Sequence, residues 1–172
     1  MKELGVKLED RSVVEPARRA AAEAEAAGKG HKGIFVGAAM ELRDGSIVTG
    51  KNSPLMHASS ALVLNAVKKL AEIPDRIHLL SPSIIESVAA LKKNVFGAKS
   101  VSLDLSEVLI CLSINAATNP MAQLALEKMK ELQGCEVHIT HIPTPGDEAG
   151  LRRFGTNLTT DPTFSSKHLF VG

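Results

Sequence analysis

Apolar and polar residues follow one another along the chain with periods that predict helices separated by short strands. Residues 12–28, SVVEPARRAAAEAEAAG, are rich in alanine and end in glycine, which predicts a helix closed by a glycine cap. The runs IFVGAAMEL and SIVTG flank Asp44-Gly45, and an Asp-Gly pair supplies the positive φ of a tight turn, so they predict a β-hairpin. Apolar residues at three- to four-residue spacing predict a second helix from about His57 to Ala71.

The second half of the chain predicts further helices with short strands between them. RIHLLS, residues 76–81, is a short apolar run that predicts a strand, and Ser81-Pro82 then opens a helix that reaches Leu91. SEVLICLSINAAT predicts a buried helix, with a strand as the alternative, and Asn119-Pro120 opens a helix that Gly134 ends. The remaining predicted elements are a strand in CEVHITHI, a short helix in GDEAGLRRFG and a short strand in TNLTTD.

This order of elements predicts an α/β fold in a single domain that spans residues 1–172. Strands that are separated by helices predict parallel crossovers, while the opening hairpin adds one antiparallel pair. The expected architecture is therefore a three-layer sandwich around a mixed sheet.

Composition and charge narrow the range of functions. The 172 residues are 44% hydrophobic, enough for one well-formed core. The formal net charge is +1, and five Phe with no Trp or Tyr offer few rings for stacking bases, so we expect neither a nucleic acid nor an anionic membrane as partner. Cys111 and Cys135 form no CxxC pair, which is typical of a reducing compartment, and the N-terminal residues contain no apolar signal segment. The sequence therefore predicts a soluble, cytoplasmic protein.

One stretch, residues 48–61, carries a motif known from zinc enzymes. VTGKNSPLMHASSA places a strand end, a Gly-x-Asn turn and His-Ala at the head of an apolar helix, after VGAA and Asp-Gly earlier in the chain. This arrangement is similar to the cytidine deaminase-like fold, and the likeness in architecture covers about residues 12–161. It implies that Asn52 corresponds to the asparagine that contacts the ribose in cytidine deaminases.

The deaminase chemistry itself is not encoded. Zinc deaminases need three His or Cys ligands and a glutamate that moves protons between the bound water and the base. His57 matches the first ligand, but Ser59 stands where the glutamate belongs, and residues 117–120, Ala-Thr-Asn-Pro, stand where two cysteines would be expected. The sequence therefore predicts no zinc, no other cofactor and no deaminase activity.

Other catalytic arrangements are also weak in the sequence. His138 and His141 are three residues apart on a predicted strand, so they point to opposite faces and cannot share a metal ion. Ser59 and Ser60 do not face His57 along a helix, and no carboxylate is predicted to orient the imidazole. The sequence thus favours a binding domain over an enzyme.

After these exclusions, the sequence still indicates a possible ligand-binding site at two helix starts and one loop. The helices that start at His57 and Asn119 present unpaired backbone N–H groups, and the resemblance implies that these two starts face one another. The loop HIPTPGDE leaves a strand end, where ligands bind in open α/β sheets. Simpler roles for Asn52, as a turn residue, and for Asp147, as a helix cap, remain open. The predicted ligand-binding residues are Asn52, His57, Ser59, Ser60, Thr118, Asn119, Thr144 and Asp147, and the expected ligand is small, polar or anionic, such as a nucleotide.

A second resemblance covers nearly the whole chain. IVTGKNSPLMHASSA, SINAATNPMAQLALEKMKELQGCEVH and LRRFGTNLTTDP resemble the C-terminal region of a bacterial family catalogued as domain of unknown function 1846. Its long members carry an N-terminal P-loop-like nucleotide domain, which the resemblance suggests as a partner, and no GxxxxGK loop occurs here. Deaminase-like domains usually associate through helices, so we also expect a homo-oligomer. The alternatives to a ligand-binding domain are an enzyme of unassigned chemistry and a purely structural oligomerisation domain.

Overall fold

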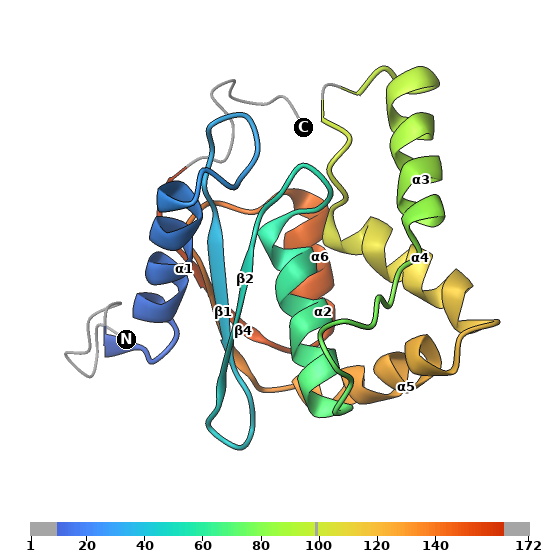
Figure 1. Cartoon of the computed structure of the whole chain (residues 1–172). Coiled ribbons are helices and arrows are strands. Elements are labelled where there is room, and N and C mark those ends of the chain that lie inside the picture. Colours follow the sequence, from blue (N-terminus) through green and yellow to red (C-terminus); the bar gives the residue numbers. More distant parts are fainter. Residues whose placement is uncertain (1–9, 99, 164–172) are drawn as a thin grey trace.

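The computed structural model describes residues 10–98 and 100–163, and within them the chain forms six α-helices and a four-stranded sheet (Figure 1). The elements follow the predicted order except at one point. They are α1 (Val14–Ala26), β1 (Gly37–Glu41), β2 (Ile47–Lys51), α2 (Ala58–Leu70), α3 (Pro82–Asn94), α4 (Leu105–Ala116), α5 (Pro120–Lys128), the 3-10 turn η3 (Met129–Leu132), β3 (Glu136–Ile139), α6 (Pro145–Arg153) and β4 (Asn157–Thr160).

The sheet is mixed, with the strand order β2-β1-β3-β4. β1 runs antiparallel to both of its neighbours, β2 and β3, whereas β3 and β4 run parallel. The parallel pair is joined by α6, as a parallel crossover requires. The predicted α/β class, the opening hairpin and a parallel crossover are therefore confirmed.

Helices cover both faces of this sheet. α1 lies against β1 and β2 on one face, while α2 packs on the same two strands from the other face (Figure 1). Two glycines allow this close approach: a Cβ on Gly37 would lie 2.1 Å from the carbonyl oxygen of Ala17 in α1, and one on Gly50 would lie 2.4 Å from the amide nitrogen of Leu62 in α2. Any larger residue at either position would push the helix away from the sheet.

The core is divided by the sheet, as the alternation of side chains along a strand dictates. Ala38 and Met40 of β1 belong to the main hydrophobic cluster on the α2 side, whereas Ala39 packs with Val13 and Ala17 beneath α1. The main cluster continues beyond α2 into α4 and α5, so helices α3 to α5 form an additional helical layer there.

The predicted strand at residues 76–81 is wrong. That segment has no strand hydrogen bonding, although Leu79 and Leu80 are buried, and it lies on the helical side away from the sheet. The carbonyl oxygen of Leu79 accepts a hydrogen bond from the side-chain amide of Asn115 at 2.5 Å. The apolar run therefore reflects irregular backbone packed under helices, because burial alone does not supply a neighbouring strand.

The helix predicted from SEVLICLSINAAT forms as α4, but it is only partly buried. Val108 and Leu112 lie in the core, whereas Ile110 and Ile114 are 62% and 63% exposed. A helix that is apolar all round therefore turns one apolar face outward here. Among the described residues, no helix has the length and apolar character that crossing a bilayer requires.

Candidate functional site

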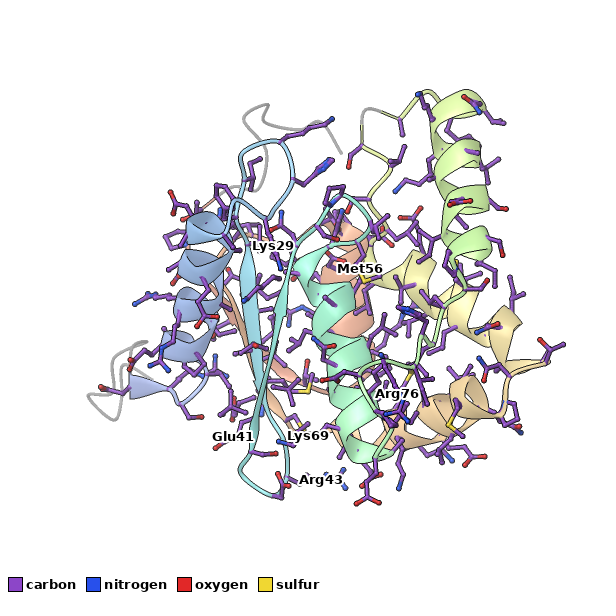
Figure 2. The ribbon with its side chains drawn as sticks, viewed as in Figure 1. Lys29, Glu41, Arg43, Met56, Lys69 and Arg76 are labelled. Carbon is purple, nitrogen blue, oxygen red and sulfur yellow. The ribbon has the colours of Figure 1, made fainter. Side chains whose placement is uncertain are left out.

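Three helices begin at the same place, and their first residues form the candidate site. His57, Asp104 and Thr144 are the N-cap residues of α2, α4 and α6. Figure 2 shows Met56, the residue before His57, at the end of α2 where α4 and α6 also begin. Met56 forms a parallel bridge with Leu103, and the amide of His57 donates to the carbonyl of Leu103 at 2.8 Å, which ties the start of α2 to the start of α4.

His57 and Asp147 form a hydrogen-bonded pair at this junction. Nδ1 of His57 lies 2.9 Å from Oδ2 of Asp147, and the two residues are 90 positions apart in the chain. The other carboxylate oxygen, Oδ1, accepts the backbone N–H of Leu105 at 2.8 Å. The Asp147 side chain is only 5% exposed, whereas the imidazole is 27% exposed. The carboxylate is therefore fixed in the protein while the imidazole reaches the surface.

The electrostatic surroundings favour the protonated form of His57. Burial lowers the pKa of His57, but the hydrogen bond and charge of Asp147, together with the charge of Asp104, more than offset this, so the pKa is raised. Burial raises the pKa of Asp104, with smaller contributions from Glu107 and Asp147. The two carboxylates near His57 therefore outweigh the effect of burial on its pKa.

Asp104 joins the starts of α4 and α6. Its Oδ1 accepts the N–H of Glu107, while the Glu107 carboxylate accepts the N–H of Asp104, so the two form a capping box. A Cβ on Gly146 would lie 2.4 Å from Oδ2 of Asp104, which shows that only glycine lets α6 approach so closely. Lys92 of α3 reaches the same point, with Nζ 2.9 Å from Glu107 Oε1 and 2.7 Å from the carbonyl of Ser102.

The structure brings together three of the predicted binding residues: His57, Thr144 and Asp147. Thr144 caps α6 by accepting the N–H of Asp147 at 3.4 Å, so the cap is Thr144, and Asp147 lies within the first turn. The sequence-based conclusion that no carboxylate orients the imidazole is wrong. Asp147 comes from a helix more than eighty residues downstream, and only the folded chain places it beside His57.

Asn52 lies in the loop after β2, and its amide is engaged with the backbone. Its Oδ1 accepts the N–H of Val36 at 2.9 Å, and its Nδ2 donates to the carbonyl of Ile34 at 3.0 Å. The side chain thus fastens the segment that leads into β1, which agrees with its simpler role as a residue of a structured turn.

Ser59 and Ser60 lie inside the protein in the first turn of α2. They are 2% and 0% exposed, and the hydroxyl of Ser60 donates to the carbonyl of Leu103 at 3.0 Å. Ser60 therefore helps to hold α2 against the start of α4, and neither hydroxyl lies at the surface where His57 emerges.

Thr118 and Asn119 lie far from His57. Asn119 caps α5 by accepting the N–H groups of Met121 and Ala122, and it follows the C-terminal end of α4. The site lies at the other end of α4, and twelve helical residues span about 18 Å. The expectation that the helix starts at His57 and Asn119 face one another is therefore wrong, because α4 separates them.

Asp104, Glu107 and Lys92 were not among the predicted site residues. The tetrapeptide Asp104-Leu-Ser-Glu107 before an apolar run is a capping-box signal, so the start of α4 was visible in the sequence. Lys92 gave no such signal, because its partners come from other elements. In the described ranges, no cluster of three or more His, Cys, Asp or Glu side chains is arranged to hold a metal ion.

Sequence comparisons place the chain among proteins of unknown function. It is 44% identical over 170 residues to a UPF0371 protein of Clostridium tetani (strain Massachusetts / E88), and 46% identical over 171 residues to a UPF0371 protein of Clostridium botulinum (strain Langeland / NCTC 10281 / Type F). Each alignment covers 99% of this chain but 34% of the relative, so the chain spans about a third of the length of these relatives. The family model described as "Domain of unknown function DUF1846, C-terminal" matches residues 9–170, and the chain belongs to this family.

Proposed function

We propose that this domain binds a small polar or anionic ligand, such as a nucleotide, at the exposed edge of His57. The observation that carries the proposal is the His57–Asp147 hydrogen bond at 2.9 Å. Because Nδ1 is held by a buried carboxylate, the ring is fixed in orientation and Nε2 is left to serve a ligand.

The charges around the ring support an anionic ligand. The raised pKa of His57 favours an imidazolium, which donates from both ring nitrogens. The positive end of α2 adds to this potential, and α2 begins without a side-chain cap on its first N–H groups. A phosphate or carboxylate group would therefore meet a fixed cationic donor.

The substitution His57→Asn tests this directly. An asparagine amide retains a donor near the position of Nδ1 and is a favourable N-cap, but it has nothing in place of Nε2. We expect inorganic phosphate or a nucleoside monophosphate to raise the melting temperature of the native chain, because a ligand that binds only the folded state stabilises it. His57→Asn should abolish that shift.

A matched control is available in His78, which is exposed in the loop before α3. His78→Asn removes the same chemical group outside the site and should retain the full ligand-induced shift. Absence of a shift in the native chain across a broad panel of anions and nucleotides would refute the proposal, as would a shift that persists in His57→Asn.

The same pair supports a second candidate function, acid–base catalysis. A histidine whose Nδ1 is bonded to a buried carboxylate, and whose side chain is 27% exposed, has the arrangement of a general acid or base. Its Nε2 would give a proton to, or accept one from, a bound substrate while Asp147 stabilises the imidazolium. This observation reopens the enzyme alternative that the sequence disfavoured.

Following the fate of a compound that stabilises the protein distinguishes ligand binding from acid–base catalysis. If the compound is recovered unchanged by NMR after long incubation, the domain is a binding module. If it is converted, His57→Asn should stop the conversion. Asp147→Asn should slow the conversion and reduce the melting-temperature shift, because the neutral amide no longer favours the imidazolium. Conversion that survives in His57→Asn would exclude this pair as the source of the activity.

We also propose that the fold is deaminase-like but zinc-free. Support comes from the element order, with an opening helix, a hairpin and His57 at the head of the following helix. Ser59 occupies the position of the proton-moving glutamate and is buried. Ser59→Glu should therefore release no ammonia from cytidine or adenosine, and measurable release would contradict this proposal. In the longer relatives we expect the domain to work beside an N-terminal nucleotide domain.

A further inference from the structure

A basic, glycine-rich loop joins α1 to β1, and it ends in a tight turn. Residues 28–33 read Gly-Lys-Gly-His-Lys-Gly. The N–H of His31 donates to the carbonyl of Ile34 at 3.1 Å, and the N–H of Ile34 donates to the carbonyl of His31 at 3.0 Å. Lys32 and Gly33 lie between them with φ angles of 53° and 75°, as a type I′ turn requires. The turn therefore presents His31 and Lys32 on a backbone of defined geometry.

Lysine is an unusual residue at the first central position of such a turn. Both central residues need a positive φ, so Asn-Gly and Asp-Gly are the preferred pairs, whereas this turn has Lys32-Gly33. Positions where a chain departs from a local preference are often functional sites. The consequence of the departure here is a positive charge at the tip of the turn, where Lys32 is exposed.

Side-chain contacts tie this turn to the start of α2. The amide of Asn52, in the loop between β2 and α2, donates to the carbonyl of Ile34 at 3.0 Å. Nε2 of His31 lies 3.4 Å from the hydroxyl of Ser100, and three residues further along the chain a backbone carbonyl accepts the N–H of His57 at 2.8 Å. Figure 1 shows the loop between α1 and β1 at the same end of the molecule as the loop before α2 and the segment that enters α4. His31 therefore lies beside the proposed site.

The positive groups of the turn act on one another and on His57. Burial lowers the pKa of His31, and the charges of Lys32 and His57 lower it further. Within the described residues, His57 and His138 form ion pairs with a carboxylate, whereas His31 does not. An anion bound between the turn and His57 would relieve the repulsion that these groups exert on one another.

We propose that residues 31–34 form the second side of the ligand site at His57, and that the ligand is a phosphate monoester. The inference rests on the function proposed above and adds His31 and Lys32 to the site. A phosphate monoester carries up to two negative charges near neutral pH, whereas a carboxylate or a phosphate diester carries one. A second negative charge finds its partners in the turn, since Asp147 already faces the imidazole of His57.

Methyl phosphate and dimethyl phosphate are the probes that test this. They are the smallest monoester and diester, and at pH about 7.5, above a second pKa of about 6, only the monoester is mainly a dianion. In NMR titrations of the complete native chain we expect methyl phosphate to bind at least about tenfold more tightly than dimethyl phosphate, because the second charge meets the turn. His31→Asn and Lys32→Asn should each weaken methyl phosphate binding about three- to tenfold and reduce this preference.

Lys32→Asn separates ligand binding from folding. It creates Asn-Gly, the preferred pair of a type I′ turn, so the melting temperature of the unliganded variant should be unchanged or higher while the affinity falls. Lys69→Asn is the matched control, because it removes the same charge at the far end of α2 from Met56 (Figure 2), and it should leave the affinity unchanged.

The outcomes distinguish this inference from the proposed function. If methyl phosphate does not bind the native chain, or binds equally well to His57→Asn, the proposed function fails and this inference fails with it. If binding depends on His57 but is unaffected by both His31→Asn and Lys32→Asn, only the inference is overturned. Equal affinities of the native chain for the two phosphates would overturn the assignment to a phosphate monoester.

Discussion

Two histidine–aspartate pairs lie on opposite sides of the sheet, and they differ in the exposure of the histidine and in the direction of its pKa shift. His57 and Asp147 meet where α2, α4 and α6 begin, and the imidazole is 27% exposed. His138 and Asp161 meet on the α1 side at the ends of β3 and β4, and the His138 side chain is completely buried. The pKa of His57 is raised, whereas that of His138 is lowered.

The difference begins with the geometry of each pair. Nδ1 of His57 is hydrogen-bonded to Asp147. In the other pair, Nδ1 of His138 bonds the hydroxyl of Thr159 at 2.8 Å, while Nε2 lies 3.2 Å from Oδ1 of Asp161 without hydrogen-bond geometry. Asp161 therefore offers His138 mainly its charge.

Competition for the carboxylate completes the difference. Asp147 accepts one further bond, from the neutral backbone N–H of Leu105, so its charge acts on His57. Asp161 accepts two hydrogen bonds from the Arg18 guanidinium, at 3.1 Å and 2.8 Å. Burial lowers the pKa of His138, the charge of Asp161 opposes this, and Arg11 and Arg18 reduce that opposition. The same two residue types thus form a partly exposed pair with a raised histidine pKa in one place and a buried pair with a lowered histidine pKa in the other.

The largest effect is expected from removing the buried histidine. His138→Ala should lower the free energy of unfolding by about 2–4 kcal/mol, because it leaves a cavity in a fully buried site. Urea denaturation gives this value directly. His57→Asn, which changes a partly exposed residue and retains a donor for Asp147, should cost less than about 1 kcal/mol. Equal losses in the two variants would show that the two pairs do not differ in structural role.

A smaller effect is expected when the carboxylate of the exposed pair is neutralised. Asp147→Asn can retain the bond to the Leu105 N–H but loses a charged hydrogen bond, so it should cost about 1–3 kcal/mol. The pKa of His57 should fall, because the carboxylate that raises it is gone. An NMR titration of the His57 ring protons measures this, and an unchanged pKa would show that Asp147 does not control the imidazole.

Local sequence signals predicted most of the fold. Asp44-Gly45 predicted the hairpin, Ser81-Pro82 the start of α3, and Asn119-Pro120 the start of α5, because turn and cap preferences act over a few residues. The run at residues 76–81 was misassigned because apolar character alone does not show whether a strand partner exists.

The candidate site was less predictable than the fold. His57 and Asp147 were both selected, but their contact depends on how β3 delivers the chain to α6, which no local pattern records. Asn52 was selected from a resemblance, and the structure commits its amide to Ile34 and Val36. Contacts between residues far apart in the sequence are set by packing. The site residues could therefore be predicted in part, but their contacts could not.

The pH dependence of stability should separate the two histidines. The folded pKa of His57 is raised, so its stabilisation is complete below the unfolded value of about 6.5 and is lost as pH rises through the folded pKa. The folded pKa of His138 is lowered, so its contribution is present above about 6.5 and is lost as pH falls through the folded pKa. His31 and His141, whose pKa values burial also lowers, act in the same direction as His138.

Melting temperatures across pH 5 to 8 measure this dependence. The difference between the native chain and His57→Asn should be largest at acidic pH and should shrink as the pH rises. His78→Asn should follow the native chain throughout, since it replaces an exposed histidine outside the site. A difference for His57→Asn that grows with rising pH would contradict the raised pKa.

The smallest change in stability, and the sharpest test of the comparison, is expected from Arg18→Ala. Arg18 is 41% exposed, so losing its ion pair with Asp161 should cost no more than about 1 kcal/mol. The charge of Arg18 lowers the pKa of His138 and its hydrogen bonds lower that of Asp161, so its removal leaves the carboxylate to act on the imidazole. The pKa of His138 should therefore rise in Arg18→Ala, as the pKa of His57 is raised by its own carboxylate.

Arg19→Ala is the control, because Arg19 lies next to Arg18 on α1 but pairs with Glu15. This variant should leave the pKa of His138 unchanged. If NMR titration shows the same His138 pKa in Arg18→Ala as in the native chain, burial alone sets it, and competition for the carboxylate does not explain the difference between the two pairs.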